Sequence, residues 1–215
     1  AQARAGAEAA LTTLARAGER IPADLRPFAD ALVRSRDTVL QRMSLPPLAD
    51  SGLMKTRYHG DFHLGQVLVV ADDLMIIDFE GEPGRPLLER RRKSSPLRDV
   101  AGMLRSINYA AVAALRGATA DRAEDTSKLE PLALDWERRS VESFLTGYRA
   151  AIAGCASYPV EPNDARQLLE LFVLEKAFYE ISYELANRPA WVRIPLEGIR
   201  AILGDSLVAE SVDAR

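Results

Sequence analysis

The stretch HGDFHLGQVLVVADDLMIIDFE, residues 59–80, decides the fold expected of this chain. It holds two short apolar runs rich in β-branched residues, QVLVV at 66–70 and LMIIDF at 74–79. Asp72 and Asp73 stand between the runs, and paired aspartates are typical of a tight turn. The pattern therefore predicts a hairpin of two short strands.

Polar residues stand at the ends of this hairpin. Asp61 precedes the first strand, Gln66 starts that strand and Asp78 ends the second, so folding the hairpin brings all three to one edge. Two carboxylates and an amide oxygen form a set of hard oxygen ligands suited to Mg²⁺, which also binds substrate phosphates. Phosphoryl transfer requires such a metal, and a carboxylate that orients an attacking hydroxyl and takes its proton. The edge of the hairpin is therefore the candidate active site.

The sequence on both sides of the hairpin is predicted to be mostly helical, from apolar residues at helical spacing. The expected helices cover 1–20, 24–44, 97–115, 136–152, 166–187 and 196–203. A Gly/Pro loop and a charged connection are expected over 80–96, and a mobile loop over 118–131, which is rich in small and polar residues. The expected fold class is mainly α with a small β-hairpin.

The composition excludes several classes of protein. The 215 residues are 47% hydrophobic and 27% charged, and the net charge of −3 disfavours a dedicated nucleic-acid-binding protein. The single cysteine, Cys155, excludes an internal disulfide framework, and two histidines leave little for a His-rich metal site. There is no apolar run of about 20 residues and no secretory leader, so we expect a cytoplasmic protein without a membrane span.

Residues 59–66 and 78–80 resemble the pattern H-x-D-x-x-x-x-N followed by D-F-x, with Gln66 in place of the Asn. It belongs to the protein-kinase-like fold, and the HGD variant is similar to its aminoglycoside phosphotransferase branch. The longer string HGDFHLGQVL…IIDFEGEPGRPLLERRRKSSPLRDVAGMLRS is similar to the bacterial maltokinases, including those fused behind a trehalose synthase domain. The resemblance covers roughly 50 continuous residues here.

The resemblance implies a role for each polar residue. Asp61 would be the catalytic base that faces the sugar hydroxyl, and Asp78 the principal Mg²⁺ ligand. Gln66 would replace the usual kinase Asn as the second ligand, with the same amide oxygen on a side chain one methylene longer. His59 and Asp99 would support the loop structurally. We expect His63 to pack against the loop or to hydrogen-bond within it.

A second informative segment lies in LFVLEKAFYEISYELANRPAW, residues 171–191. Lys176, Tyr179 and Glu180 stand at i, i+3 and i+4, which predicts one shared helix face. The segment is similar to the sugar-binding region of maltokinases, so these three residues are the candidate substrate-binding set. Tyr183 and Trp191 are expected in the core.

The resemblance also implies how the chain is organised. Residues 1–215 would be the C-terminal lobe of a protein-kinase-like fold, with a catalytic loop at 56–66, a metal-binding segment at 76–82 and an acceptor-sugar region at 132–204. The β-rich N-terminal lobe that holds most of the nucleotide is absent, because residues 1–45 are predicted to be helical and no Gly-rich loop stands between two strands. The segment alone is therefore expected to be inactive.

The function implied for the parent protein is ATP-dependent phosphorylation of maltose to maltose 1-phosphate, with ATP and Mg²⁺ as cofactors. One alternative keeps the fold and changes the acceptor to an aminoglycoside or another small alcohol; the mixed face of Lys176, Tyr179 and Glu180 disfavours a polycation. Another is a non-catalytic assembly domain attached to trehalose synthase. The presence of both Asp61 and Asp78 argues against a pure scaffold.

Overall fold

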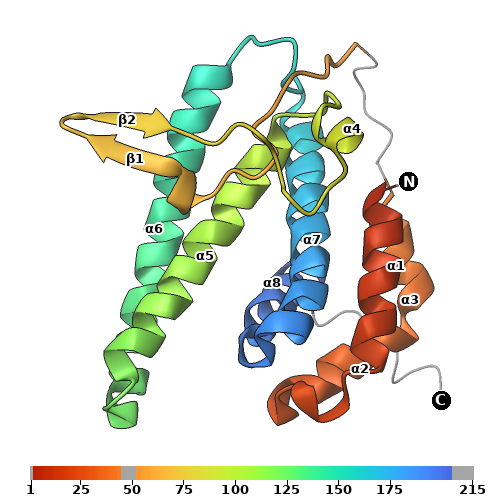
Figure 1. The fold of residues 1–215 in the computed structure, drawn as a ribbon, viewed down its shortest axis with the longest axis vertical. Helices are drawn as coiled ribbons and strands as arrows, with labels where there is room; N and C mark the ends of the chain where they lie inside the picture. Colours follow the sequence, from red (N-terminus) through yellow and green to blue (C-terminus); the bar gives the residue numbers. More distant parts are fainter. Residues whose placement is uncertain (1, 45–51, 205–215) are drawn as a thin grey trace. The chain divides into compact units, whose positions relative to one another are not determined.

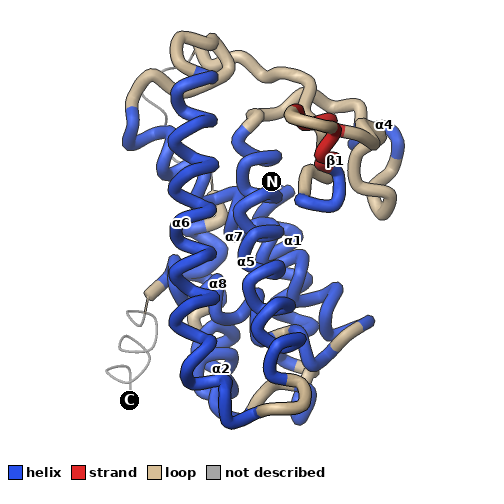
Figure 2. The backbone as a smooth tube through the Cα atoms, turned by 90° about the vertical axis from the view of Figure 1, so that its left-hand side faces the viewer, coloured by secondary structure: helices blue, strands red, loops and turns tan. Residues whose placement is uncertain are grey.

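The computed structural model describes residues 2–44 and 52–204. Most of them are helical, and the described strands form a single two-stranded antiparallel sheet (Figures 1 and 2). None of the helices in this part of the chain is long and apolar enough to cross a membrane. The chain divides into two compact units, residues 1–47 with 166–215 and residues 48–165.

The first unit is an all-helical cluster. Its helices are α1 (Gln2–Ala15), α2 (Arg26–Arg34), α3 (Arg36–Arg42), α7 (Pro162–Asn187, apart from its first turn) and α8 (Arg193–Leu203), with short 3₁₀ turns at Gly18–Arg20, Ala23–Leu25 and Pro189–Trp191. Alanines and leucines of α1 recur at helical spacing in its core, and Leu11 and Leu14 are almost fully buried, as the sequence indicates. The small alanine side chains allow α2 and α3 to pack close to α1.

Several helix boundaries in this unit differ from the prediction. The helix expected over 1–20 ends at Ala15 and is followed by the 3₁₀ turn Gly18–Arg20, and the helix expected from residue 166 begins at Pro162. The single helix expected over 24–44 is divided at Ser35, whose φ of −86° and ψ of 29° end α2 and start α3. This break turns the chain so that Val39 and Leu40 of α3 also reach the core. The closing helix begins at Arg193, so Pro195 lies in its first turn, where a missing N–H breaks no helical hydrogen bond.

The second unit contains the hairpin and two long helices. Strands β1 (Val67–Val70) and β2 (Asp73–Ile76) pair antiparallel with Val67 opposite Ile76 and Val70 opposite Asp73. The hairpin is therefore confirmed, but its turn is Ala71–Asp72, one residue earlier than expected; Ala71 has a φ of 53°. Helices α4 (Leu87–Arg90), α5 (Leu97–Thr119) and α6 (Thr126–Ile152) follow, and α5 and α6 pack side by side (Figures 1 and 2).

The mobile loop predicted over 118–131 is wrong for most of its length. Helix α5 continues to Thr119, a 3₁₀ turn covers Ala123–Asp125, and α6 begins at Thr126. Lys128, Leu129 and Glu130 are good helix formers, and Pro131 falls early in α6, where it removes few helical hydrogen bonds. Composition suggested a loop because the stretch is polar, but polar residues suit an exposed helix equally well.

Helix α5 supports the loop that precedes the hairpin. The amide N–H of Leu64 donates to Ser106 Oγ (3.0 Å) on α5. At Gly102, one turn earlier on α5, an added Cβ would lie 2.6 Å from the carbonyl oxygen of Phe62. The main chain of the loop thus contacts the main chain of α5, and only glycine, which has no Cβ, fits at position 102.

Replacing Gly102 with alanine should therefore destabilise the protein by about 1–3 kcal/mol, since either the loop or the helix must shift. Gly117→Ala in the same helix is the matched control, because an added Cβ there meets nothing within 4 Å. It should leave stability unchanged or raise it by up to about 1 kcal/mol. Urea denaturation measures both; equal effects would contradict the close approach.

Candidate active site

The loop before β1 is fastened to the start of α5 by one carboxylate. Asp99 lies in the first turn of α5 and accepts two main-chain hydrogen bonds, from His59 N–H to Oδ2 (2.6 Å) and from Gly60 N–H to Oδ1 (2.9 Å). The loop also begins at a two-hydrogen-bond bridge between Thr56 and Ser94. Both contacts fix the main chain immediately before Asp61.

The buried imidazole of His59 joins the loop to the segment that carries Asp78. Its Nδ1 accepts the N–H of Asp61 (3.3 Å), so in the neutral ring Nε2 carries the hydrogen and donates to the carbonyl of Ile77 (2.8 Å). The rings of Phe62 and Phe79 lie against it, with centroids 5.5 and 4.9 Å away. His59 and Asp99 thus contact the main chain of the loop, and His59 also contacts the segment that carries Asp78.

The backbone around Asp78 follows an uncommon path. Asp78 has a φ of 63°, a left-handed conformation that few residues other than glycine adopt. Gly60 (φ 87°) and Gly81 (φ 79°) adopt the same region, and a Cβ on Gly60 would lie 3.1 Å from the Cα of Gly81. The loop and the segment that carries Asp78 therefore touch through their glycines. Arg90 of α4 fixes the far side, donating to the carbonyl oxygen of Glu80 (3.3 Å).

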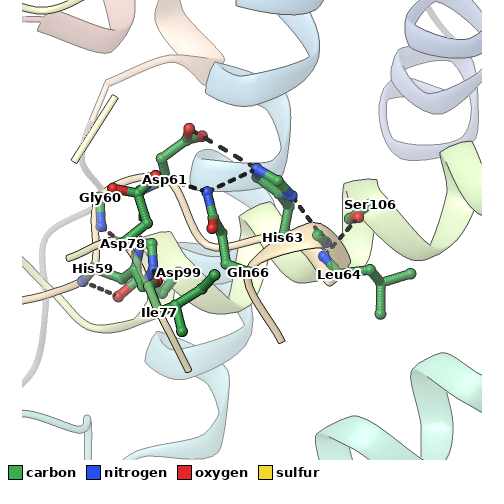
Figure 3. A network of polar contacts seen from close by, with 11 residues as sticks. His59, Gly60, Asp61, His63, Leu64, Gln66, Ile77, Asp78, Asp99 and Ser106 are labelled. Atoms are coloured by element: carbon green, nitrogen blue, oxygen red, sulfur yellow. Dashed lines mark hydrogen bonds and ion pairs between the residues drawn. The ribbon is translucent and has the colours of Figure 1, made fainter. Parts of the chain in front are cut away.

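The structure brings Asp61, Gln66 and Asp78 to one rim (Figure 3). The side-chain amide of Gln66 lies 3.2 Å from Asp78 Oδ2, measured from Nε2. His63 lies between Gln66 and Asp61: its Nε2 is 3.4 Å from Gln66 Nε2 and 4.0 Å from Asp61 Oδ2. The gathering predicted from the hairpin is present, with His63 as an additional member.

The chemistry of these donors fits Mg²⁺. Asp78 carries carboxylate oxygens, and the terminal amide of Gln66, whose Nε2 donates to Asp78 Oδ2, carries an amide oxygen that would serve as a second ligand. Mg²⁺ commonly takes only one or two protein carboxylates and completes its shell with water and phosphate. No cluster of three or more His, Cys, Asp or Glu side chains suited to a metal occurs among the residues described.

Burial shifts the pKa of the carboxyl group that anchors the loop. Desolvation raises the pKa of Asp99 above its usual value of 3.8, against the opposing effect of the hydrogen bonds from Gly60 and His59. The folded protein therefore keeps this proton at pH values where the unfolded chain has released it. The stability that Asp99 contributes is fullest below pH 3.8 and declines as the pH rises through the raised pKa.

The predicted substrate-binding residues lie on α7 in the other unit. Lys176 Nζ is 5.1 Å from the centroid of the Tyr179 ring, and Tyr179 is exposed. Glu180 is only 7% exposed, so it does not share the exposed face of Tyr179. Tyr183, expected in the core, is wrong: it is 45% exposed and stacks with Tyr179 at 6.4 Å between centroids.

The sequence contained a signal for this aromatic pair. Tyr179 and Tyr183 stand at i and i+4, which places them on adjacent turns of the same helix face. Arg188 lies 5.6 Å from the Tyr183 ring and 5.0 Å from the half-buried Trp191, and it forms a bidentate ion pair with Glu184. Alternating cations and aromatic rings thus continue along the end of α7.

Comparison with known proteins relates this chain to sugar kinases. It is 29% identical over 149 residues to a glucosamine kinase of Mycolicibacterium smegmatis (strain ATCC 700084 / mc(2)155), covering 68% of this chain and 34% of that protein. It is 27% identical over 196 residues to the glucosamine kinase of Streptacidiphilus jiangxiensis, covering 88% and 38%. The chain thus spans little more than a third of these relatives. No family model matches it.

Solved structures give the fold. A glucosamine kinase (crystal form B) superposes with a TM-score of 0.65 at 23% identity, over 94% of this chain and 45% of that one. Glucosamine kinase in complex with glucosamine, ADP and inorganic phosphate gives a TM-score of 0.63 at 22% identity, over 97% and 49%. The chain therefore shares the fold of about half of each of those structures.

Removing the Asp99 carboxylate should leave the main-chain N–H groups of His59 and Gly60 without their acceptor. We expect Asp99→Ala to lower the free energy of unfolding by at least about 2 kcal/mol. Because the raised pKa makes Asp99 most stabilising at low pH, the gap between parent and variant should narrow as the pH rises above 3.8. Denaturation across pH, with exposed Asp121→Ala as control, measures it; a widening gap would contradict the assignment.

Proposed function

We propose that the protein containing this chain transfers the γ-phosphoryl group of ATP to a hydroxyl of a small sugar, with maltose as acceptor and maltose 1-phosphate as product. The observation that carries the proposal is the gathering of Asp61, Gln66 and Asp78 on one rim beside a supported loop. This is the equipment that phosphoryl transfer requires. The similarity to glucosamine kinases supports the reaction class.

Each residue of the rim has a proposed task. Asp61, held in place through its main-chain N–H by His59, orients the acceptor hydroxyl and takes its proton as the oxygen attacks phosphorus. Gln66 and Asp78 would hold Mg²⁺, which neutralises negative charge on the phosphates when it is bound. The hydrogen bonds of His59 and Asp99 fix the main chain that carries these groups. Neither His59 nor Asp99 is proposed to contact the substrate.

The face of α7 supports a neutral disaccharide as acceptor. Tyr179 and Tyr183 offer two exposed rings on adjacent turns, with centroids 6.4 Å apart, and aromatic rings supply flat apolar surface for a sugar ring to pack against. Lys176 beside Tyr179 supplies a hydrogen-bond donor and disfavours a cationic ligand at that point. Glu180 is buried, and we propose that it supports this face from beneath the exposed rings.

Glucosamine is the second candidate acceptor, because the relatives bear that name and one solved neighbour is a complex with glucosamine and ADP. Its ammonium group would require a carboxylate at the platform, where Lys176 stands instead. An aminoglycoside is disfavoured for the same reason. A non-catalytic domain attached to trehalose synthase would not require the rim.

The hairpin supports the proposal that a further lobe completes the site. Its apolar side chains are exposed on both faces, among them Val69 at 78% on one face and Met75 at 52% on the other. A two-stranded apolar ribbon is marginally stable by itself and tends to be covered by another element. We propose that the nucleotide-binding lobe covers it, consistent with relatives more than twice as long.

The acceptor and the base are tested together in the full-length protein. Asp61→Asn should lower kcat at least about 100-fold with unchanged folding, because the hydroxyl loses its proton acceptor. In a panel of maltose, glucosamine and an aminoglycoside, maltose should give the highest kcat/KM. Transfer to glucosamine alone would favour the second candidate, and normal assembly with no transfer to any acceptor would favour the scaffold.

Tyr183→Ala tests the platform. It should raise KM for maltose about tenfold with little change for glucosamine, since a single ring needs only Tyr179. Tyr158→Phe, an aromatic change outside α7, is the control. Equal effects on both sugars would contradict a two-ring platform.

A further inference from the structure

His63 is the one residue of the rim to which neither the resemblance nor the proposed reaction gives a task. Its side chain caps the short 3₁₀ turn Leu64–Gln66, because Nδ1 accepts the amide N–H of Gly65 (3.1 Å). The ring lies directly over Gly65: a Cβ added there would be 2.9 Å from Cε1 and 3.0 Å from Nδ1. The position of the imidazole is thus fixed by main chain.

This cap determines which nitrogen carries the hydrogen. A main-chain N–H can only donate, so Nδ1 must accept, and the neutral ring therefore carries its hydrogen on Nε2. The Nε2–H group faces the rim, 3.4 Å from the terminal amide of Gln66 and 4.0 Å from Asp61 Oδ2. The Gln66 amide is the nearer partner, and 4.0 Å exceeds an ordinary hydrogen bond.

The Gln66 amide has two orientations related by a half-turn of its terminal group. With its NH₂ toward Asp78, it donates to Oδ2 (3.2 Å) but places a second donor against His63 Nε2–H. With the amide turned, Oε1 accepts from His63 and lies beside the Asp78 carboxylate. Two oxygens so close repel each other unless a cation lies between them.

We propose that His63 is a positioning residue: its Nε2–H selects the orientation of Gln66 that presents Oε1, together with Asp78, to a divalent cation. This inference rests on the proposed metal site and adds the group that prepares it. Without a cation the amide donates to Asp78; with one it accepts from His63. The imidazole itself touches neither the metal nor the reacting atoms.

Two substitutions separate the cap from the orienting contact. His63→Asn keeps an acceptor, Oδ1, at the position of Nδ1 and can still cap Gly65, but it has no donor that reaches Gln66. His63→Gln places its terminal NH₂ where Nε2–H stands and loses the cap acceptor. A structural role predicts that the Asn variant is the milder; the orienting role predicts the reverse for metal affinity.

The experiment measures Mn²⁺ affinity of the full-length protein by electron paramagnetic resonance, with ADP present and no acceptor. We expect His63→Asn to weaken Mn²⁺ binding about tenfold or more, as loss of a partner of a metal ligand does, while His63→Gln stays within about threefold of the parent. Gly65→Ala, which displaces the ring, should resemble His63→Asn. Thermal unfolding verifies that each variant is folded.

Asp78→Asn distinguishes failure of the role of His63 from failure of the metal site on which that role rests. If it abolishes Mn²⁺ binding while His63→Asn binds as tightly as the parent, or if His63→Gln is as weak as His63→Asn, the role of His63 is overturned and the metal site stands. If Asp78→Asn leaves Mn²⁺ binding unchanged, the metal site itself fails and the role of His63 fails with it.

Discussion

The carboxylate of Asp99 holds the main chain from which the rest of the rim extends. It accepts the N–H groups of His59 and Gly60 from the first turn of α5, so this side chain ties the start of the helix to the loop. The folded position of Asp61 depends on that anchor through His59, whose ring receives the Asp61 N–H and reaches across to Ile77. Removing the anchor would release both ends of this connection.

Close main-chain approaches complete the arrangement. Gly102 lets the Phe62 carbonyl lie on α5, and Gly60 lies against Gly81. Asp78 adopts a left-handed backbone conformation without being glycine, a strain of about 1–3 kcal/mol that its surroundings must offset. Such strain in a residue that would hold a metal is consistent with a site shaped for a ligand.

Local sequence predicted what depends on local pattern. The hairpin was predictable because β-branched runs flank a short polar turn, and the helices because of their apolar spacing. The turn was misplaced by one residue because both Asp72 and Asp73 suit turns, and α6 was missed at its start because polarity does not separate an exposed helix from a loop. Tyr183 was assigned to the core because aromatic residues are usually buried.

The hairpin predicted that Asp61, Gln66 and Asp78 lie together, but it did not predict the position of His63. The tautomer of His63 depends on the N–H of Gly65, and its effect on the site depends on a contact with Gln66.

The central claim is that Asp61, Gln66 and Asp78 form a metal-assisted phosphoryl-transfer site. A crystal structure of the full-length protein with Mn²⁺, a non-hydrolysable ATP analogue and maltose tests it most directly. The account predicts an anomalous peak at about 2.1 Å from oxygens of Gln66 and Asp78, with a sugar hydroxyl at hydrogen-bond distance from Asp61. A metal bound elsewhere, or an Asp61 side chain remote from the sugar, would contradict it.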